Sequence, residues 1–277
     1  MKKFITTLQD IWKIEELKNK IILTLGFMAV YRLMAHVPLP GIDPNQLTAL
    51  TNQTSGGLLG LLNAFTGGAF SKASIMALGV MPYISASIVV QLMGIAVPYL
   101  QKLQKEGESG RKTINQITRW LTIAITVVQG PAYIVNLQQT LPASTFLLGG
   151  AMFWLSSMVL LTAGTVFAMW LGEKITDKGI GNGISLLIMV GIIARFPSAF
   201  MQEVGSRMTQ SNGGLIMILI EIVLWFLVIL ATVFLVTAVR RIAVQYARRT
   251  VAGNVNNIAG ARQYIPLKVN SAGVMPI

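Results

Sequence analysis

Six long apolar stretches that carry almost no charge limit what this chain can fold into. They cover about residues 21–37, 73–97, 114–135, 146–171, 183–201 and 215–239. A helix of about 20 apolar residues is long enough to cross roughly 30 Å of hydrocarbon. We therefore expect an all-α polytopic membrane protein with six spans.

The composition of the 277 residues supports this interpretation. Hydrophobic side chains make up 53% of the sequence and charged side chains 12%, whereas an average soluble domain carries roughly 25% charged residues. A soluble domain of this size would need more polar surface than the sequence offers. The chain has no cysteine, which argues against a small disulfide-linked secreted protein.

Lysine and arginine are distributed unevenly along the chain. They number 22, against 10 Asp and Glu. All of them lie in the N-terminus or in alternate loops, apart from Arg32, Lys72, Arg195 and Arg207. Because cationic loops stay on the cytoplasmic side of a membrane, this pattern places the N-terminus in the cytoplasm. The same charges are compatible with a docking surface for an anionic partner such as ribosomal RNA.

The first 20 residues form a separate segment. Phe4, Leu8, Ile11 and Trp12 recur at helical spacing, and we expect residues 1–20 to lie flat on the cytoplasmic membrane surface as an amphipathic segment. A flexible polar tail is the alternative. No small-residue cleavage site follows the first apolar stretch, which argues against a cleaved signal peptide.

Residues 58–65 form a short apolar segment between two glycine pairs, at 56–57 and 67–68. The segment is too short to span a membrane. Irregular backbone at membrane depth must be covered by protein. The segment is therefore either a re-entrant helix inside a cavity or an interfacial helix on the outer leaflet.

The beginning of the second apolar stretch combines a proline with small polar residues. Val80 and Ile84 are four residues apart and share one helix face, and Pro82 between them is expected to bend the helix. Ser85 and Ser87 are small polar residues, which in membrane helices usually permit close packing against a neighbour. Close packing is the simplest interpretation of this segment.

The sequence offers little that is suited to catalysis. It has one histidine, His36, and no cysteine, so we expect no catalytic residue, no cofactor, no metal site and no enzymatic activity. Arg32 and Glu221 are the ionisable residues deepest in the apolar stretches. Charges inside a membrane are functional candidates by default, but a structural role is the simpler interpretation of both.

Several long motifs are typical of one membrane protein family. They are VPLPGID at 37–43, GGAFSKASIMALGVMPYISASIVVQL at 67–92, KEGESGRK at 105–112, GTVFAMWLGEKITDKGIGNGIS at 164–185, RRIAVQYARR at 240–249 and LKVNSAGVMP at 267–276. In these motifs the chain resembles the SecY family, whose members form the central subunit of the bacterial protein-conducting channel.

The resemblance implies a SecY-like helical bundle. Family members have ten spans in two pseudo-symmetric halves, and residues 21–201 would form the first five-span half, with a plug at 56–70. Residues 202–277 would supply the sixth span, a basic cytoplasmic loop and the start of the seventh span, at Ile265 or Val269.

The resemblance also implies roles for individual residues. The apolar pore ring would contain Val80, Ile84 and Ile188. The plug would contain Leu58, Leu59, Leu61, Leu62, Asn63 and Phe65. One side of the lateral gate would contain Ser85, Ser87, Ile88 and Gln91. The partner-binding residues of the basic loop would be Arg240, Arg241, Arg248, Arg249, Arg262 and Lys268.

The function implied by the resemblance is a passive conduit in the bacterial plasma (inner) membrane. It would move unfolded secretory polypeptides across the membrane and release apolar segments, such as signal sequences, sideways into the lipid bilayer. The motor ATPase SecA or the ribosome would drive it, and SecE and SecG would bind it. The alternatives are a secondary transporter of a small solute, which would share the broken helices, and an inactive half-channel scaffold.

Overall fold

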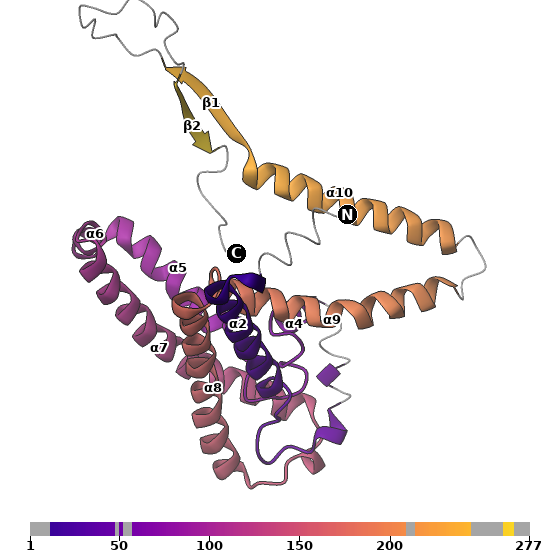
Figure 1. Ribbon diagram of the computed structural model, residues 1–277. Helices are drawn as coiled ribbons and strands as arrows, with labels where there is room; N and C mark the ends of the chain where they lie inside the picture. The colour runs from indigo at the N-terminus through magenta and orange to yellow at the C-terminus, as the bar shows by residue number, and fades with distance from the viewer. Residues whose placement is uncertain (1–11, 48–49, 52–56, 209–213, 245–262, 269–277) are drawn as a thin grey trace, which may run out of the picture. The chain divides into compact units, whose positions relative to one another are not determined.

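The structure, a computed structural model, describes residues 12–47, 50–51, 57–208, 214–244 and 263–268. The chain divides into two compact units, Met1–Ala199 and Phe200–Ile277. Helices dominate both units (Figure 1), as expected for a helical membrane protein, and the second unit adds a sheet of two strands.

Each of the six expected spans corresponds to a long helix. These helices are α2 (Glu15–Met34), α5 (Met81–Ala96), α7 (Glu108–Thr140), α8 (Gly150–Lys178), α9 (Gly183–Met208) and α10 (Gly214–Thr237). By length and hydropathy, α7, α8, α9 and α10 can each cross a membrane, and α5 with α6 (Pro98–Lys105) would make a fifth span. α2 falls short of this measure because charged residues crowd its N-terminal end.

The second expected span is helical over only part of its length. Residues 73–80 form turns, and α5 begins at Met81, so Pro82 lies in the first turn of the helix. The N–H groups of a first turn have no helical partner, so a proline there removes no hydrogen bond. The prediction that Pro82 bends the helix was therefore wrong, because this proline starts the helix.

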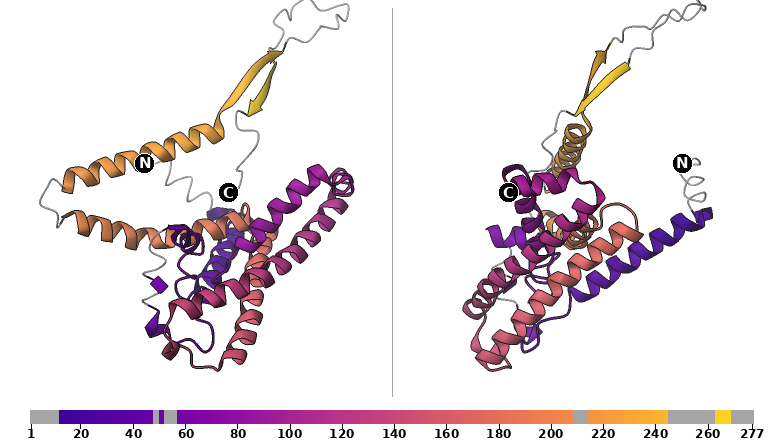
Figure 2. Two further views of the ribbon diagram at one scale, coloured as in Figure 1. Left: turned by 180° about the vertical axis from the view of Figure 1, so that it is seen from behind. Right: turned by 90° about the vertical axis from the view of Figure 1, so that its left-hand side faces the viewer.

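A sharp bend of 100° separates α5 from α6. Val97 lies between them in an extended conformation, and Pro98 begins α6. A residue that precedes proline is disfavoured in the helical region, which explains the break. The bend returns the chain toward α7, which packs against α5, α6 and α8. Figure 1 and Figure 2 show α5 and α7 side by side.

Two apolar clusters form the core of the first unit. One joins α7 and α8 to residues of the segments 39–50 and 70–77, with Ile134, Leu137 and Leu161 fully buried. The other surrounds Tyr31 of α2 and Met76, and it includes residues of α8 and α9. Together the clusters enclose the non-helical chain that leads into α5.

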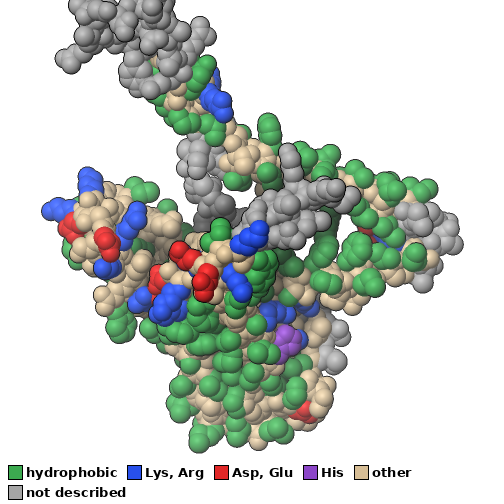
Figure 3. Space-filling view, viewed as in Figure 1, with side chains coloured by type: hydrophobic (Ala, Val, Ile, Leu, Met, Phe, Trp, Pro, Cys, Tyr) green, Lys and Arg blue, Asp and Glu red, His purple; other side chains and the backbone are tan. Residues whose placement is uncertain are grey.

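Charge divides the surface of the first unit. In Figure 3, blue and red side chains gather at the end of the helices that carries α6, and the opposite end is mostly green and tan. Between these ends, apolar side chains are exposed along the helices: Val128 of α7 is 75% exposed and Leu155 of α8 is 69% exposed. Such a band of apolar side chains is suited to contact with lipid.

The second unit contains α10 and a β-hairpin. β1 (Val239–Val244) pairs antiparallel with β2 (Gln263–Lys268), with Ile242 opposite Ile265. Figure 2 shows the two strands extending from the end of α10. Ile265 therefore lies in a strand, and the prediction of a seventh span beginning there was wrong. Pro266 follows it and suits an edge strand of a two-stranded sheet, while Val269 lies outside the described residues.

The close approach of α8 to the segment before α5 gives a test of the first unit. A Cβ atom at Gly164 would collide with the backbone carbonyl of Ile75. We expect Gly164→Ala to lower the stability of the protein by about 1–3 kcal/mol, because the backbones must move apart. Thermal unfolding in detergent micelles measures the change. Gly26→Ala in α2 is the control, since a Cβ there meets nothing within 4 Å, and equal stability of both variants would contradict the packing.

Candidate functional site

The short apolar segment is a helix, α4 (Gly57–Phe65). Glycines in the left-handed region lie on both sides of it: φ is +65° at Gly57, +65° at Gly67 and +89° at Gly68. Residues with a side chain rarely adopt these angles, so glycine suits the backbone at these three positions, and Gly56 lies outside the described residues. Leu58 lies in α4, but its side chain lies outside the part of the chain that the structure describes.

Asn63 ties α4 to the chain that follows it. Its side chain is only 1% exposed. The side-chain oxygen Oδ1 accepts a hydrogen bond from the Ser71 N–H at 3.1 Å, and the backbone carbonyl accepts one from the Gly68 N–H at 2.8 Å. Both bonds satisfy buried N–H groups outside a helix. Asn63 was expected only as a member of the plug, and its anchoring contact was not foreseen.

α4 covers a cavity of about 380 Å³ in the first unit. Leu59 and Leu62 contribute to its wall, together with Tyr133 of α7 and Ser85 of α5. Leu61 is 59% exposed instead. One side of α4 therefore faces the protein, which both the re-entrant and the interfacial alternatives allow.

The structure brings two of the three expected pore-ring residues into one apolar cluster. Val80 is 3% exposed and precedes α5, and Ile188 of α9 packs against the cluster that contains it. Ile84 lies one turn into α5, where its N–H donates to the Val80 carbonyl at 3.1 Å. The cluster brings the beginning of α5 and the first turns of α9 together.

The expected gate residues lie mainly on one face of α5. Its buried residues recur every fourth position from Pro82 to Gly94, and α5 packs against α7. Ile88 and Gln91 lie with Ile84 away from this buried face, and Ser87 lies at its edge. The Gln91 Nε2 donates to the Ser87 Oγ at 3.4 Å. Ser85 differs from them, because it borders the cavity under α4.

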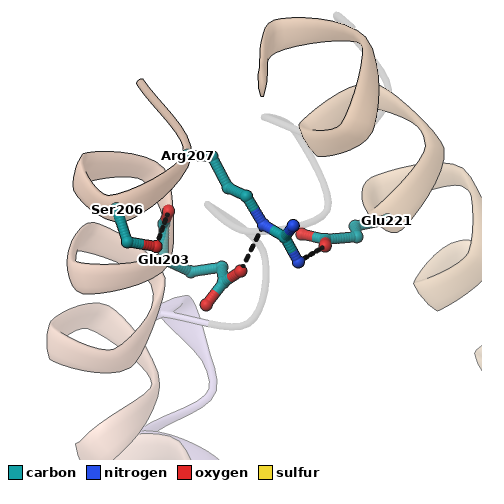
Figure 4. Close-up of polar contacts among 4 residues, drawn as sticks. All are labelled: Glu203, Ser206, Arg207 and Glu221. Atoms are coloured by element: carbon teal, nitrogen blue, oxygen red, sulfur yellow. Dashed lines mark hydrogen bonds and ion pairs between the residues drawn. The ribbon is translucent and has the colours of Figure 1, made fainter. Parts of the chain in front are cut away.

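Both deep charges of the sequence have partners. The Arg32 Nη1 donates to the Gly67 carbonyl at 3.1 Å. In the second unit, Glu221 of α10 accepts from the Arg207 Nη2 at 2.6 Å, and Arg207 also bonds Glu203 one turn earlier, at 2.8 Å (Figure 4). These contacts give both charges a structural role. The sequence identified them as unusual but did not reveal their partners.

The basic residues are only partly described. Arg240 and Arg241 are exposed neighbours in β1, so their side chains project from opposite faces of the hairpin. Lys268 ends β2 opposite Val239. The remaining expected partner-binding residues lie outside the described residues: Arg248, Arg249 and Arg262. Within the described ranges, no group of three or more potential metal-ligating side chains occurs.

The described spans make this chain a multi-pass helical membrane protein, with a short helix packed over a cavity between its spans. A family model for SecY matches residues 74–277. The motifs of the sequence and this match agree. The chain belongs to the SecY family.

Three relatives named protein translocase subunit SecY show the extent of the similarity. The protein of Streptomyces scabiei is 40% identical over 284 residues, covering 99% of this chain and 64% of the relative. That of Haemophilus influenzae is 42% identical over 261 residues, covering 94% and 58%. That of Escherichia coli is 40% identical over 262 residues, covering 94% and 58%. The chain thus spans between 58% and 64% of the length of these relatives.

Two solved structures share the fold. One is the structure of a protein conducting channel, with a TM-score of 0.57 and 17% identity, covering 91% of this chain and 52% of that chain. The other concerns a SecY protein whose plug domain stabilises the closed state of the translocation channel and maintains a membrane seal. It aligns with a TM-score of 0.56 and 18% identity, over 91% of this chain and 52% of that one. At these identities the likeness establishes the fold alone.

The contact of Asn63 generates a prediction about α4. We expect Asn63→Ala to destabilise the seating of α4 by about 1–3 kcal/mol, because the buried Ser71 N–H loses its acceptor. Hydrogen exchange measured for the α4 amides would report the loss as faster exchange. Leu61→Ala is the matched control, because this side chain of α4 is 59% exposed. Equal exchange in the two variants would show that Asn63 does not anchor the helix.

Proposed function

We propose that the chain forms the first half of a protein-conducting channel and the sixth span that follows it. The channel is a passive conduit for unfolded secretory polypeptides and carries out no catalytic step. One observation supports this proposal most strongly: Val80 and Ile188 share an apolar cluster in the unit where α4 covers a cavity. A closed pore needs such an apolar constriction and an element that seats beside it.

The pore ring is formed by Val80, Ile84 and Ile188, with matching residues of the second half. Branched aliphatic side chains offer an ion no replacement for its hydration shell, so a narrow apolar constriction resists the passage of ions. Apolar contacts are non-directional, so the ring parts around a polypeptide and closes after it. Leu58, Leu59, Leu61, Leu62, Asn63 and Phe65 act as the plug of the closed state.

The lateral gate lies along α5. Ile88 and Gln91 lie away from the face that is buried in the first unit, Ser87 lies at the edge of that face, and Ser85 borders the cavity under α4. When this face separates from the seventh span, an apolar segment of the client leaves the aqueous pore for lipid. Each buried CH₂ group of that segment contributes about 0.8 kcal/mol to the transfer.

The chain is organised in three parts. Residues 1–20 form the cytoplasmic amphipathic segment, of which residues 1–11 lie outside the described residues. Residues 21–201 form the first half with the plug at 56–70, and residues 202–277 supply the sixth span, the basic cytoplasmic loop and the approach to the seventh span. The division of contacts between Ala199 and Phe200 supports a boundary near residue 201. The protein lies in the bacterial plasma (inner) membrane with its N-terminus in the cytoplasm, consistent with the charge pattern.

The channel binds SecA or the ribosome at its cytoplasmic surface, and SecE and SecG beside its helices. SecA or the ribosome, through its RNA, docks on the basic loop at Arg240, Arg241, Arg248, Arg249, Arg262 and Lys268. Arginine suits this role because it pairs bidentately with phosphates and carboxylates. SecE and SecG complete the channel, and the signal sequences of clients enter through the gate.

The pore ring is tested by replacing Val80, Ile84 and Ile188 with serine. We expect a higher ion conductance in planar bilayers that hold the complete channel, because hydroxyl groups give partly dehydrated ions new ligands. The same three positions replaced by leucine form the control and should retain the seal. Unchanged conductance in the serine variant would remove the ring assignment. Uptake of a small solute without a client polypeptide would favour the transporter instead.

Docking at the hairpin is tested by charge reversal. We expect Arg240→Glu with Arg241→Glu to weaken binding of SecA or ribosomes to membranes that contain the channel. The remaining binding should depend less on salt, because fewer exposed charges are screened. Arg240→Lys with Arg241→Lys preserves the charge and is the control. If the reversed variant bound both partners at normal strength, these arginines would serve only as topology signals.

A further inference from the structure

The C-terminal end of α4 is held by a residue of a different helix. α4 ends at Phe65, and the Arg32 Nη1 of α2 donates to the carbonyl of Gly67, two residues beyond, at 3.1 Å. The Gly67 carbonyl lies in the turn that follows the helix, and a cation near the C-terminal end of a helix is favourable. Arg32 therefore contributes both a hydrogen bond and a favourable charge at this end of α4.

The same end of α4 contacts the backbone of α9. A Cβ atom at Gly67 would lie 2.8 Å from the Gly191 Cα, and a Cβ at Gly191 would lie 2.9 Å from the Phe65 carbonyl. The backbones can approach this closely because both residues, Gly67 and Gly191, are glycines. We call this approach the hinge contact. Gly191 shares one face of α9 with Ile188 of the pore ring and with Arg195. The hinge contact thus lies one turn from the ring.

Three cations surround the hinge contact. The Arg195 guanidinium lies beside Gly68, where a Cβ would be 3.5 Å from the Nε. Lys72 is exposed, and the charges of Arg32 and Arg195 both act on its amine. Within the described residues, no carboxylate forms an ion pair with any of these three cations. Their mutual repulsion opposes the single hydrogen bond of Arg32.

We propose that Arg32 is the latch of the closed state, which ties the end of α4 to α2 through the Gly67 carbonyl and so keeps Gly67 beside Gly191 of α9, and that Lys72 and Arg195 keep this latch weak enough to open. The inference rests on the proposed function, since a latch on α4 regulates transport only if α4 closes a channel. A hydrogen bond to one carbonyl, opposed by two neighbouring cations, is a contact that a client polypeptide can break when it displaces α4.

The latch is tested by hydrogen exchange of the α4 amides, with the protein in lipid nanodiscs. In Arg32→Gln we expect exchange to become about tenfold faster or more, as when a hydrogen bond from a charged donor is lost. Arg32→Lys, which keeps the charge and one donor, should give an intermediate rate. Lys72→Gln is the matched control. It removes a cation that repels Arg32, so we expect exchange of the α4 amides to be equal to or slower than in the unchanged protein. Unchanged exchange of the α7 and α8 amides verifies that each variant is folded.

The salt dependence of α4 exchange gives a second test, because the latch predicts the direction of the change. Added salt screens repulsion between like charges, so α4 exchange in the unchanged protein should slow as salt rises, and less so in Lys72→Gln. The latch is overturned if Arg32→Gln leaves α4 exchange unchanged, or if Arg32→Gln and Lys72→Gln speed it equally. The channel is a separate question: unchanged conductance of the serine ring variant would remove the ring assignment, and uptake of a small solute without a client would overturn the proposed function, whatever the exchange of α4 shows.

Discussion

The non-helical chain of residues 66–80 imposes the central constraint on this structure. A backbone at membrane depth finds no water for its polar groups, so protein must satisfy them. The surrounding elements do so: the Leu39 N–H donates to the Ala73 carbonyl at 2.8 Å, and the Ile75 N–H donates to the Val37 carbonyl at 3.0 Å. The Tyr133 hydroxyl of α7 donates to the Phe70 carbonyl at 2.9 Å. The segment is thus fixed by α7 and by the loop after α2.

This fixed segment determines where the candidate site lies. It carries α4 at one end and Val80 at the other, so both are positioned by the same set of hydrogen bonds. The glycines at 67 and 68 make the turn out of α4, and Pro82 begins α5 immediately after the segment. A short helix and an apolar constriction are therefore neighbours because of one irregular stretch of chain, which the two apolar clusters of the first unit enclose.

The sequence predicted the features that depend on local pattern. Hydropathy located the long helices, and glycine pairs marked both ends of α4. It failed where the outcome depends on neighbours that are distant in sequence. Pro82 was expected to bend a helix, but tertiary hydrogen bonds hold the preceding residues in turns, so the helix begins there. Ile265 was expected in a span, but it pairs with Ile242 across a hairpin. The roles of ring, gate and basic loop came from the family resemblance, not from periodicity.

Charged residues of the spans either form an ion pair with another helix or bind a neutral backbone group. The sequence alone does not show which of the two a given residue does. Arg119 of α7 binds Glu173 of α8 with two hydrogen bonds, at 2.9 and 2.6 Å, and Arg207 binds Glu221 in the second unit. Each pair joins two helices, and removing one partner would leave a charge without its counter-ion. Arg32 instead binds a neutral carbonyl. Water or a passing peptide group can replace that carbonyl without leaving a charge unpaired. Opening this contact therefore costs less free energy than breaking an ion pair in the same place.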